Sequence, residues 1–251
     1  MILDTETISV AKPYCYNIGY IIYDTQTEEV VLKREFVVEQ VWHNRPLFAS
    51  AYYANKRPLY VSAMRGKRAK LEKYGNIQKQ MIKDIKYHAV EGVYAFNSAF
   101  DDGVFEFNAN MYGCRNAIDT TPVYDIRGYA IEYLMTQGYK EFCNSNKNDK
   151  FITPADGYKT TAESFYCYLT NNPDFAEAHT ALADCEIELE ILKKCIERGA
   201  TWQTEYKVAR SYPRNTPRVM QLKDTDGNIY EFNYSTKIER KTENGVVVSL
   251  K

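Results

Sequence analysis

Three strand-forming segments at the start of the chain constrain its fold more than any other feature. They cover residues 2–7, 17–22 and 30–38, and a polar turn at 24–29 separates the second from the third. Successive strands joined by polar turns are typical of an antiparallel meander. We therefore expect the chain to open with a three-stranded sheet, and a sheet with the first strand in its centre is one arrangement that fits.

Strands and helices then alternate over the next 160 residues. Short strands are predicted at 93–96 and 123–126, the first of them leading into a helix near Asp101. Helical apolar spacing appears at 129–134, 161–169 and 178–196. The last of these is the strongest helix in the sequence, with acids at its start, Lys and Arg at its end, Thr180 as an N-cap and Gly199 as a C-cap. This alternation predicts an α/β fold.

The composition changes after Tyr212-Pro213. Two turn-and-strand patterns follow, around 219–232 and 238–248, with turn residues at 226–228 and 244–245. We expect a main domain at 1–212 and a small β-rich C-terminal extension at 213–251. Within the main domain, residues from about 44 to 90 are predicted to form a basic helical insertion.

Two acids in the first strand point to chemistry. Residues two apart in a strand face the same side, so Asp4 and Glu6 direct both carboxylates at one place. Like charges at such a distance repel each other unless a cation lies between them. A divalent metal ion is the simplest candidate, because hard cations bind carboxylate oxygens.

Cations accumulate in the predicted insertion. The net charge of the chain is −1, so any binding of nucleic acid must depend on a local patch. A basic run is usually a solvated helix face, but this one is also a candidate surface for a phosphate backbone. The cations that we consider for substrate binding are Lys67, Arg68, Lys70 and Lys73.

The remaining composition excludes several classes of protein. Six cysteines have no C-x-x-C spacing, which argues against a zinc site and favours reduced, mostly buried thiols. No signal-peptide pattern and no run long enough to cross a membrane is present. We expect a cytoplasmic protein with no membrane partner.

Three segments resemble a known set of motifs. Asp4-x-Glu6 opens the chain, Asn97-x-x-Phe100-Asp101 follows a predicted strand, and His179-Thr-Ala-Leu-Ala-Asp184 begins the strongest helix. In order and spacing these segments resemble the motifs of the DEDDh 3′–5′ exonuclease superfamily, which includes the proofreading subunit of bacterial replicative polymerases. The resemblance covers roughly residues 1–200.

The resemblance implies a ribonuclease H-like mixed sheet flanked by helices and a two-metal hydrolysis of phosphodiester bonds. Asp4, Glu6, Asp101 and Asp184 would bind two Mg²⁺ or Mn²⁺ ions, and His179 would be the general base. Thr5 and Asn97, which lie within the motifs, are expected to contact substrate.

The implied substrate is single-stranded DNA or a frayed DNA 3′ end. One alternative is an exoribonuclease that trims RNA 3′ ends, because sequence does not reveal contacts to the 2′-OH. A non-catalytic binding module with the same fold is a second hypothesis. A third is an accessory subunit whose C-terminal extension docks onto a polymerase or another replisome protein.

Overall fold

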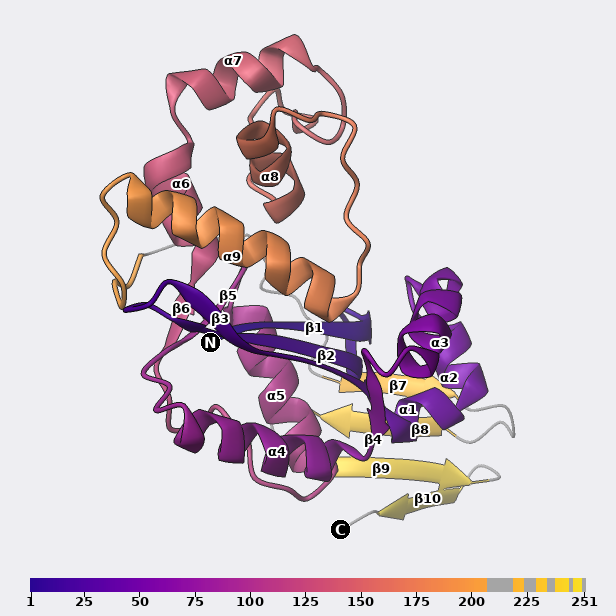
Figure 1. Cartoon of the computed structure of the whole chain (residues 1–251). Helices are drawn as coiled ribbons and strands as arrows, with labels where there is room; N and C mark the ends of the chain where they lie inside the picture. The colour runs from indigo at the N-terminus through magenta and orange to yellow at the C-terminus, as the bar shows by residue number, and fades with distance from the viewer. Residues whose placement is uncertain (207–218, 224–228, 234–237, 244–245, 250–251) are drawn as a thin grey trace.

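A six-stranded mixed sheet lies at the centre of the molecule (Figure 1). The computed structural model describes residues 1–206, 219–223, 229–233, 238–243 and 246–249. The order of strands in the sheet is β4-β3-β2-β1-β5-β6. Pairing is antiparallel between β1, β2 and β3, and parallel for β1–β5, β5–β6 and β3–β4. The strands are β1 (Ile2–Ser9), β2 (Lys12–Asp24), β3 (Glu29–Val38), β4 (Lys70–Glu72), β5 (Val93–Ala95) and β6 (Val123–Asp125).

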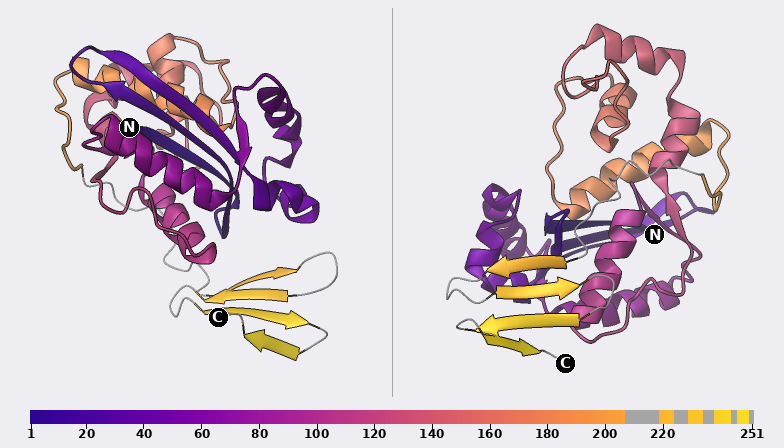
Figure 2. Two further views of the ribbon diagram at one scale, coloured as in Figure 1. Left: turned by 60° about the horizontal axis from the view of Figure 1, so that its bottom comes forward. Right: turned by 180° about the vertical axis from the view of Figure 1, so that it is seen from behind.

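Helices cover both faces of this sheet (Figures 1 and 2). The helix α9 crosses one face, with α6 to α8 beyond it, and α4 and α5 lie on the other face. The short helices α1 to α3 stand beside the end of the sheet near the start of α9. The helices are α1 (Glu39–His43), α2 (Arg45–Ala49), the 3₁₀ helix η1 (Ala54–Lys56), α3 (Arg57–Arg65), α4 (Tyr74–Tyr87), α5 (Ala99–Met111), α6 (Ile126–Leu134), α7 (Gln137–Ser145), α8 (Ala162–Thr170) and α9 (Ala181–Glu197).

The side chains of β1 alternate between two hydrophobic cores, one on each face of the sheet. Leu3 is fully buried in the core beneath α4 and α5, whereas Ile2 is buried in the core beneath α9. The side chains of Asp4 and Glu6 share the α9 face with Ile2, because side chains two residues apart in a strand point the same way. The acids therefore lie beneath α9, at the border of an apolar core.

The predicted order of elements is largely confirmed. The three opening strands form the meander, β1 lies in the interior of the sheet, and the strong helix runs from Ala181 to Glu197. The description of 44–90 as a helical insertion is corrected in two respects. Residues 70–72 form β4, which pairs with β3, and α4 buries Ile77 and Met81 in the core beneath the sheet. Much of this stretch is thus part of the main α/β framework.

The start of α9 is fixed by β2. Thr180 occupies the N-cap position, but its side chain makes no cap hydrogen bond. Instead the side-chain oxygen of Asn17 accepts a hydrogen bond from the backbone N–H of Ala181 at 2.8 Å. Gly19 of β2 lies directly under this turn, and a Cβ there would come within 2.3 Å of the Ala181 carbonyl carbon. Because Gly19 pairs with Asp4, this close approach sets the height of α9 above the acids.

Replacing Gly19 by Ala is expected to destabilise the protein by roughly 3 kcal/mol, because the backbone of α9 must move to admit one methyl group. Urea unfolding measures the effect. Gly103→Ala is the control, since Gly103 lies within α5 with no atom near its added Cβ and gains helix propensity. A Gly19→Ala variant as stable as the wild type would contradict this packing.

The C-terminal strands form a separate four-stranded antiparallel sheet of order β10-β9-β8-β7. The predicted pairing around 219–232 is confirmed, whereas the predicted turns at 226–228 and 244–245 and the boundary at 212–213 lie outside the described residues. The strands are β7 (Val219–Lys223), β8 (Ile229–Asn233), β9 (Ile238–Glu243) and β10 (Val246–Ser249).

Two further predictions concern cysteines and membranes. All six cysteines are free thiols and five of them are buried, as expected. In the described part of the chain, no helix combines the length and apolar character that crossing a bilayer requires.

Candidate functional site

Four acids from three elements converge beneath α9. Asp4 and Glu6 come from β1, Asp101 from the first turn of α5, and Asp184 from the first turn of α9. Burial raises the pKa of Asp4 well above its usual value, and the neighbouring carboxylates, including those of Asp101, Asp184 and Glu6, raise it further. The predicted acids therefore share one electrostatic environment.

Burial is also the main cause of the raised pKa values of the other three acids. It raises the pKa of Glu6 to about 9, with repulsion from Asp184 as the next cause, while a hydrogen bond from the Tyr16 hydroxyl opposes the shift. Burial raises the pKa of Asp101 and of Asp184 to about 7. In the metal-free protein, negative charge in this site is thus unfavourable at neutral pH.

Asp101 is held by Thr5. Its side chain is only 3% exposed, and the Thr5 hydroxyl donates a hydrogen bond to Oδ1 of Asp101 at 2.7 Å. This hydrogen bond orients the Asp101 carboxylate. The predicted contact of Thr5 with substrate stays a prediction.

His179 lies beside Glu6 and Asp184. One ligand atom from each of these three residues lies within 4.8 Å of the other two, a spacing that could hold a metal ion. The backbone N–H of His179 donates to the Asp184 carboxylate. His179 also has a positive φ of 52°, so the chain turns sharply just before α9. This turn brings the imidazole back over the acids.

Residues 53–60 complete the surroundings of His179. The Tyr53 ring stacks on the imidazole with 4.1 Å between centroids, and the Tyr60 hydroxyl donates to the His179 carbonyl at 3.2 Å. Burial lowers the pKa of His179, and the nearby Lys56 lowers it further. The imidazole is therefore neutral at pH 7, as a general base must be.

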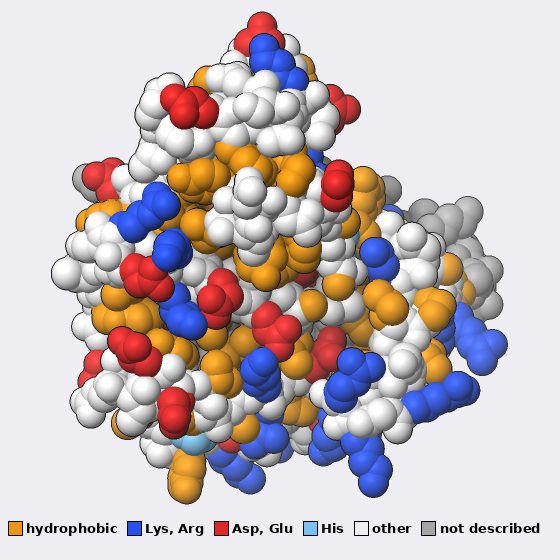
Figure 3. Space-filling model, turned by 45° about the horizontal axis from the view of Figure 1, so that its top comes forward, with side chains coloured by type: hydrophobic (Ala, Val, Ile, Leu, Met, Phe, Trp, Pro, Cys, Tyr) orange, Lys and Arg blue, Asp and Glu red, His pale blue; other side chains and the backbone are white. Residues whose placement is uncertain are grey.

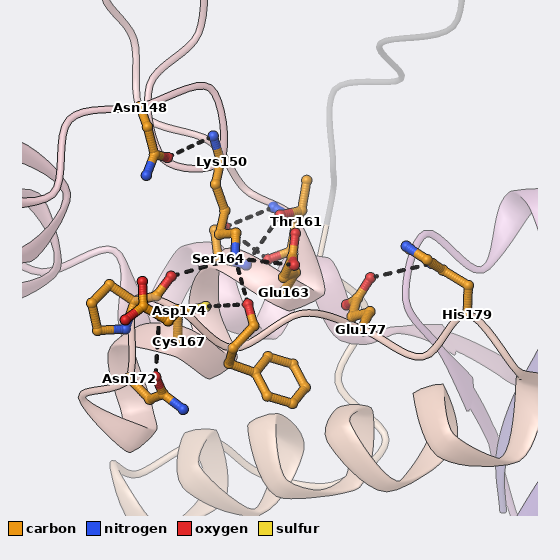
Figure 4. Close-up of polar contacts among 12 residues, drawn as sticks. Asn148, Lys150, Thr161, Glu163, Ser164, Cys167, Asn172, Asp174, Glu177 and His179 are labelled. Atoms are coloured by element: carbon orange, nitrogen blue, oxygen red, sulfur yellow. Dashed lines mark hydrogen bonds and ion pairs between the residues drawn. The ribbon is translucent and has the colours of Figure 1, made fainter.

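Charged side chains lie on the α8 side of His179, in two separate pairs (Figure 4). Lys150 forms an ion pair with Glu163 at 3.4 Å, and Nδ1 of His179 lies 3.8 Å from Oε2 of Glu177. Burial raises the pKa of Glu177 to about 8, and Asp184 and Glu163 add to the shift. Glu177 faces Nδ1, which leaves Nε2 of His179 as the nitrogen for proton transfer.

Replacing Glu177 by Gln is expected to lower turnover roughly 10- to 100-fold, because partners that orient a reactive imidazole have effects of this size. KM should change little, since Glu177 acts through His179. Steady-state kinetics measure both constants. Asp174→Asn is the control, because Asp174 is exposed on the same segment before α9. Equal turnover in the two variants would refute a positioning role for Glu177.

Asn97 lies in the turn between β5 and α5. Its backbone N–H donates to Oδ1 of Asp125 at 2.9 Å, and its φ of 64° is left-handed. Because β5 is the parallel neighbour of β1, Asn97 follows a strand end beside the acids. The predicted substrate contact of Asn97 stays a prediction.

The predicted substrate-binding cations lie on the β3–β4 side of the molecule. Lys67, Arg68 and Lys70 line a groove of ≈ 600 Å³ together with Lys33 and Arg34. Lys73 does not line it, and Lys70 also forms an ion pair with Glu72. Figure 3 shows Lys and Arg side chains gathered toward the lower and right margins of the face that it presents, with Asp and Glu across its middle.

This groove is linked to the acids through β2 and β3. Glu35 lines the groove, and the Asn17 side chain donates to its carboxylate at 3.3 Å. Asn17 is the residue whose oxygen caps α9, and Glu35 also raises the pKa of Asp184, although burial is the main cause. A ligand in the groove would thus lie next to the framework of the site.

Several carboxylate oxygens of the site have no partner in the described structure. Oδ2 of Asp4, Oδ1 of Asp184 and Oε2 of Glu188 are buried without a hydrogen bond. Buried charged oxygens need a proton, a hydrogen-bond donor or a cation. Oxygen atoms of this kind are the ligands that Mg²⁺ and Mn²⁺ prefer, so the donor set fits a divalent metal.

Four residues that contribute to this site were not predicted from the sequence. Glu188 follows Asp184 by one helical turn, a spacing that was visible in the sequence. Glu177 lies two residues before His179, but nothing local indicates that it faces the imidazole. Tyr53 and Lys56 come from the stretch between β3 and β4, and only the tertiary fold brings them to His179.

No protein-family model and no curated protein sequence matches this chain.

Proposed function

We propose that this chain is a divalent-metal-dependent 3′–5′ exonuclease that hydrolyses phosphodiester bonds at DNA 3′ ends. The observation that carries the proposal is the convergence of Asp4, Glu6, Asp101 and Asp184 in one buried site, with His179 beside it. The four acids and the histidine are the residues that the resemblance to DEDDh exonucleases selected from sequence.

The topology of the sheet supports the same proposal. Its strands β3, β2 and β1 are antiparallel, and β5 and β6 continue the sheet parallel to β1. This arrangement is compatible with a ribonuclease H-like fold, which we propose for residues 1 to about 200.

We propose that Asp4, Glu6, Asp101 and Asp184 hold two Mg²⁺ or Mn²⁺ ions. The unpartnered oxygens of Asp4 and Asp184 support this assignment. When bound, such ions supply charge neutralisation, an activated water and stabilisation of the departing 3′ oxygen.

Three side chains around the acids have specific roles in the proposed reaction. His179 takes the proton of the attacking water at Nε2, because Nδ1 faces Glu177 and the imidazole is neutral at pH 7. Tyr53 holds the plane of the imidazole by stacking. The Thr5 hydroxyl keeps the Asp101 carboxylate directed at the site.

We propose that the groove on the β3–β4 side binds the substrate backbone. Replacing Lys67, Arg68 and Lys70 together by Gln should weaken binding of single-stranded DNA and reduce the slope of log Kd against log salt by about 2, at roughly 0.7 per phosphate contact. Fluorescence anisotropy at several salt concentrations measures the slope. Lys193→Gln with Lys194→Gln is the control, since both cations lie near the far end of α9. An unchanged slope would show that these cations form a solvated surface and do not contact the substrate backbone.

A labelled-end assay tests the activity itself. The full chain is incubated with 5′-labelled single-stranded DNA and with RNA of the same sequence, in Mg²⁺ or Mn²⁺ and then in EDTA. We expect a ladder that shortens from the 3′ end and disappears with EDTA. Faster shortening of the RNA would favour the exoribonuclease alternative, and no shortening of either strand would contradict the proposal.

A polymerase or replisome partner of residues 213–251 stays a prediction. Deleting these residues should abolish partner binding and leave exonuclease activity on free DNA.

A further inference from the structure

One buried carboxylate of the site has no place in the three motifs. Glu188 lies on α9, one turn after Asp184, and is only 3% exposed. The backbone N–H of Phe96 donates a hydrogen bond to its carboxylate. The other oxygen, Oε2, is buried and has no hydrogen-bond partner in the described structure. A role limited to holding the backbone at Phe96 would leave this oxygen without a function.

The path of α9 across the sheet explains where Glu188 lies. The first turn of the helix sits on Gly19 of β2, the strand that pairs with β1 on one side. On the other side β5 pairs with β1 through Tyr94 and Ile2, so Phe96 lies at the level of Asp4. The helix lies over β2 and β1, and its Glu188 side chain reaches the backbone of Phe96 just after β5.

Asp4 lies near two acids that are one turn apart on the same face of α9. Asp184 approaches from the side of Glu6 and His179, and Glu188 approaches from the side of β5. Repulsion from Glu188 is among the charge effects felt by the Asp4 carboxyl group, second only to that from Asp101. Glu188 thus faces the same space as the motif acids.

Charge also argues for a cation at this position. Among the described residues, no Lys or Arg forms an ion pair with Glu188, Asp4 or Asp184. An ionised carboxylate that is buried without a partner is strongly destabilising. Asp4, Asp184 and Glu188 thus each offer a buried, unpartnered carboxylate oxygen, the kind of ligand that divalent ions prefer.

We propose that Glu188 is a fifth carboxylate ligand of the metal centre and holds a divalent ion from the β5 side of Asp4. This inference rests on the proposed function, since it concerns the same centre. Five carboxylates carry one more negative charge than two divalent ions balance. Because affinity rises with the charge of the ligand set, Glu188 tightens cation binding relative to a four-carboxylate centre.

Direct Mn²⁺ binding tests the proposal. The full chain is freed of metal with EDTA, dialysed and titrated with Mn²⁺, with calorimetry for affinity and electron paramagnetic resonance for free Mn²⁺. Glu188→Gln keeps the size of the side chain and an oxygen for the Phe96 N–H, but removes the charge. We expect it to weaken at least one Mn²⁺ site tenfold or more.

Glu186→Gln is the matched control. Glu186 lies on the same helix, but it is exposed and forms a surface ion pair with Lys33 at 2.6 Å. We expect less than a twofold change in its Mn²⁺ affinity. The variant Glu188→Asp keeps the charge and withdraws the carboxylate by one methylene, so it should also weaken binding, and it decides the question if Glu188→Gln does not fold.

The outcomes separate this inference from the proposed function. Wild-type Mn²⁺ affinity in the Glu188 variants, with Mn²⁺ still binding to the wild type, would overturn the role of Glu188 and leave the proposed exonuclease intact. Absence of Mn²⁺ binding to the wild-type chain would overturn both.

Discussion

Replacing Asp4 by Asn is expected to lower exonuclease turnover by on the order of 10³-fold, because it removes a ligand of the proposed ions and with it part of the electrostatic stabilisation of the transition state, where losing even one hydrogen-bond donor costs about 10²- to 10³-fold. Charge repulsion from every other acid of the site raises the pKa of the Asp4 carboxyl group, so Asp4 is close to all of the proposed ligands. Single-turnover degradation of 5′-labelled DNA measures the effect. Near-wild-type turnover would show that the site is assigned wrongly.

Two neighbouring residues on α5 provide the matched control for this prediction. Asp101 is buried in the site, whereas Asp102 is exposed one position later in the same helical turn. Asp101→Asn should reduce turnover severely, and Asp102→Asn should not. Equal effects would indicate general damage to α5 rather than loss of a site carboxylate.

The metal-free protein is expected to lose stability as the pH rises, and divalent metal should restore it. The pKa of Asp101 and Asp184 is raised to about 7 and that of Glu6 to about 9, mainly by burial. Between the ordinary carboxyl pKa and these values the folded chain holds more protons than the unfolded chain. The free energy of unfolding therefore falls with pH, by about 1.4 kcal/mol per pH unit for each proton of difference.

Thermal unfolding in EDTA at pH 5.5, 7 and 8.5 measures this dependence. We expect Tm to fall across the series, and 5 mM Mn²⁺ to raise it most at pH 8.5, where a larger share of the site's carboxyl groups is ionised and free to bind metal. Asp4→Asn should reduce the effect of Mn²⁺. A Tm that is independent of pH and Mn²⁺ would contradict the buried acidic centre.

The sequence predicted those parts of the site that depend on local geometry. The period of two along a strand put Asp4 and Glu6 on one face, and the structure has them there beneath α9. The five-residue step from His179 to Asp184 spans a helix start, where the backbone N–H of His179 donates to the Asp184 carboxylate. These relations are set by residues close in the chain, so a single sequence reveals them.

The parts that sequence did not predict depend on register and long-range packing. Asn17 caps α9 from a distant strand, and Gly19 admits the helix because of how β2 pairs with β1. The three residues 70–72 are too short a run to indicate β4, which exists because it pairs with the edge of β3. In the sequence Glu188 is one more acid on a charged helix, and only the fold places it facing Asp4.

The most direct test of the central claim is anomalous diffraction from crystals of the full chain soaked in Mn²⁺. We expect anomalous peaks at about 2.1 Å from carboxylate oxygens of Asp4, Glu6, Asp101 and Asp184, with Glu188 as a further ligand of one of them, since small divalent ions bind oxygen at about this distance. Peaks confined to surface carboxylates, with none beneath α9, would contradict a metal centre and with it the proposed hydrolysis.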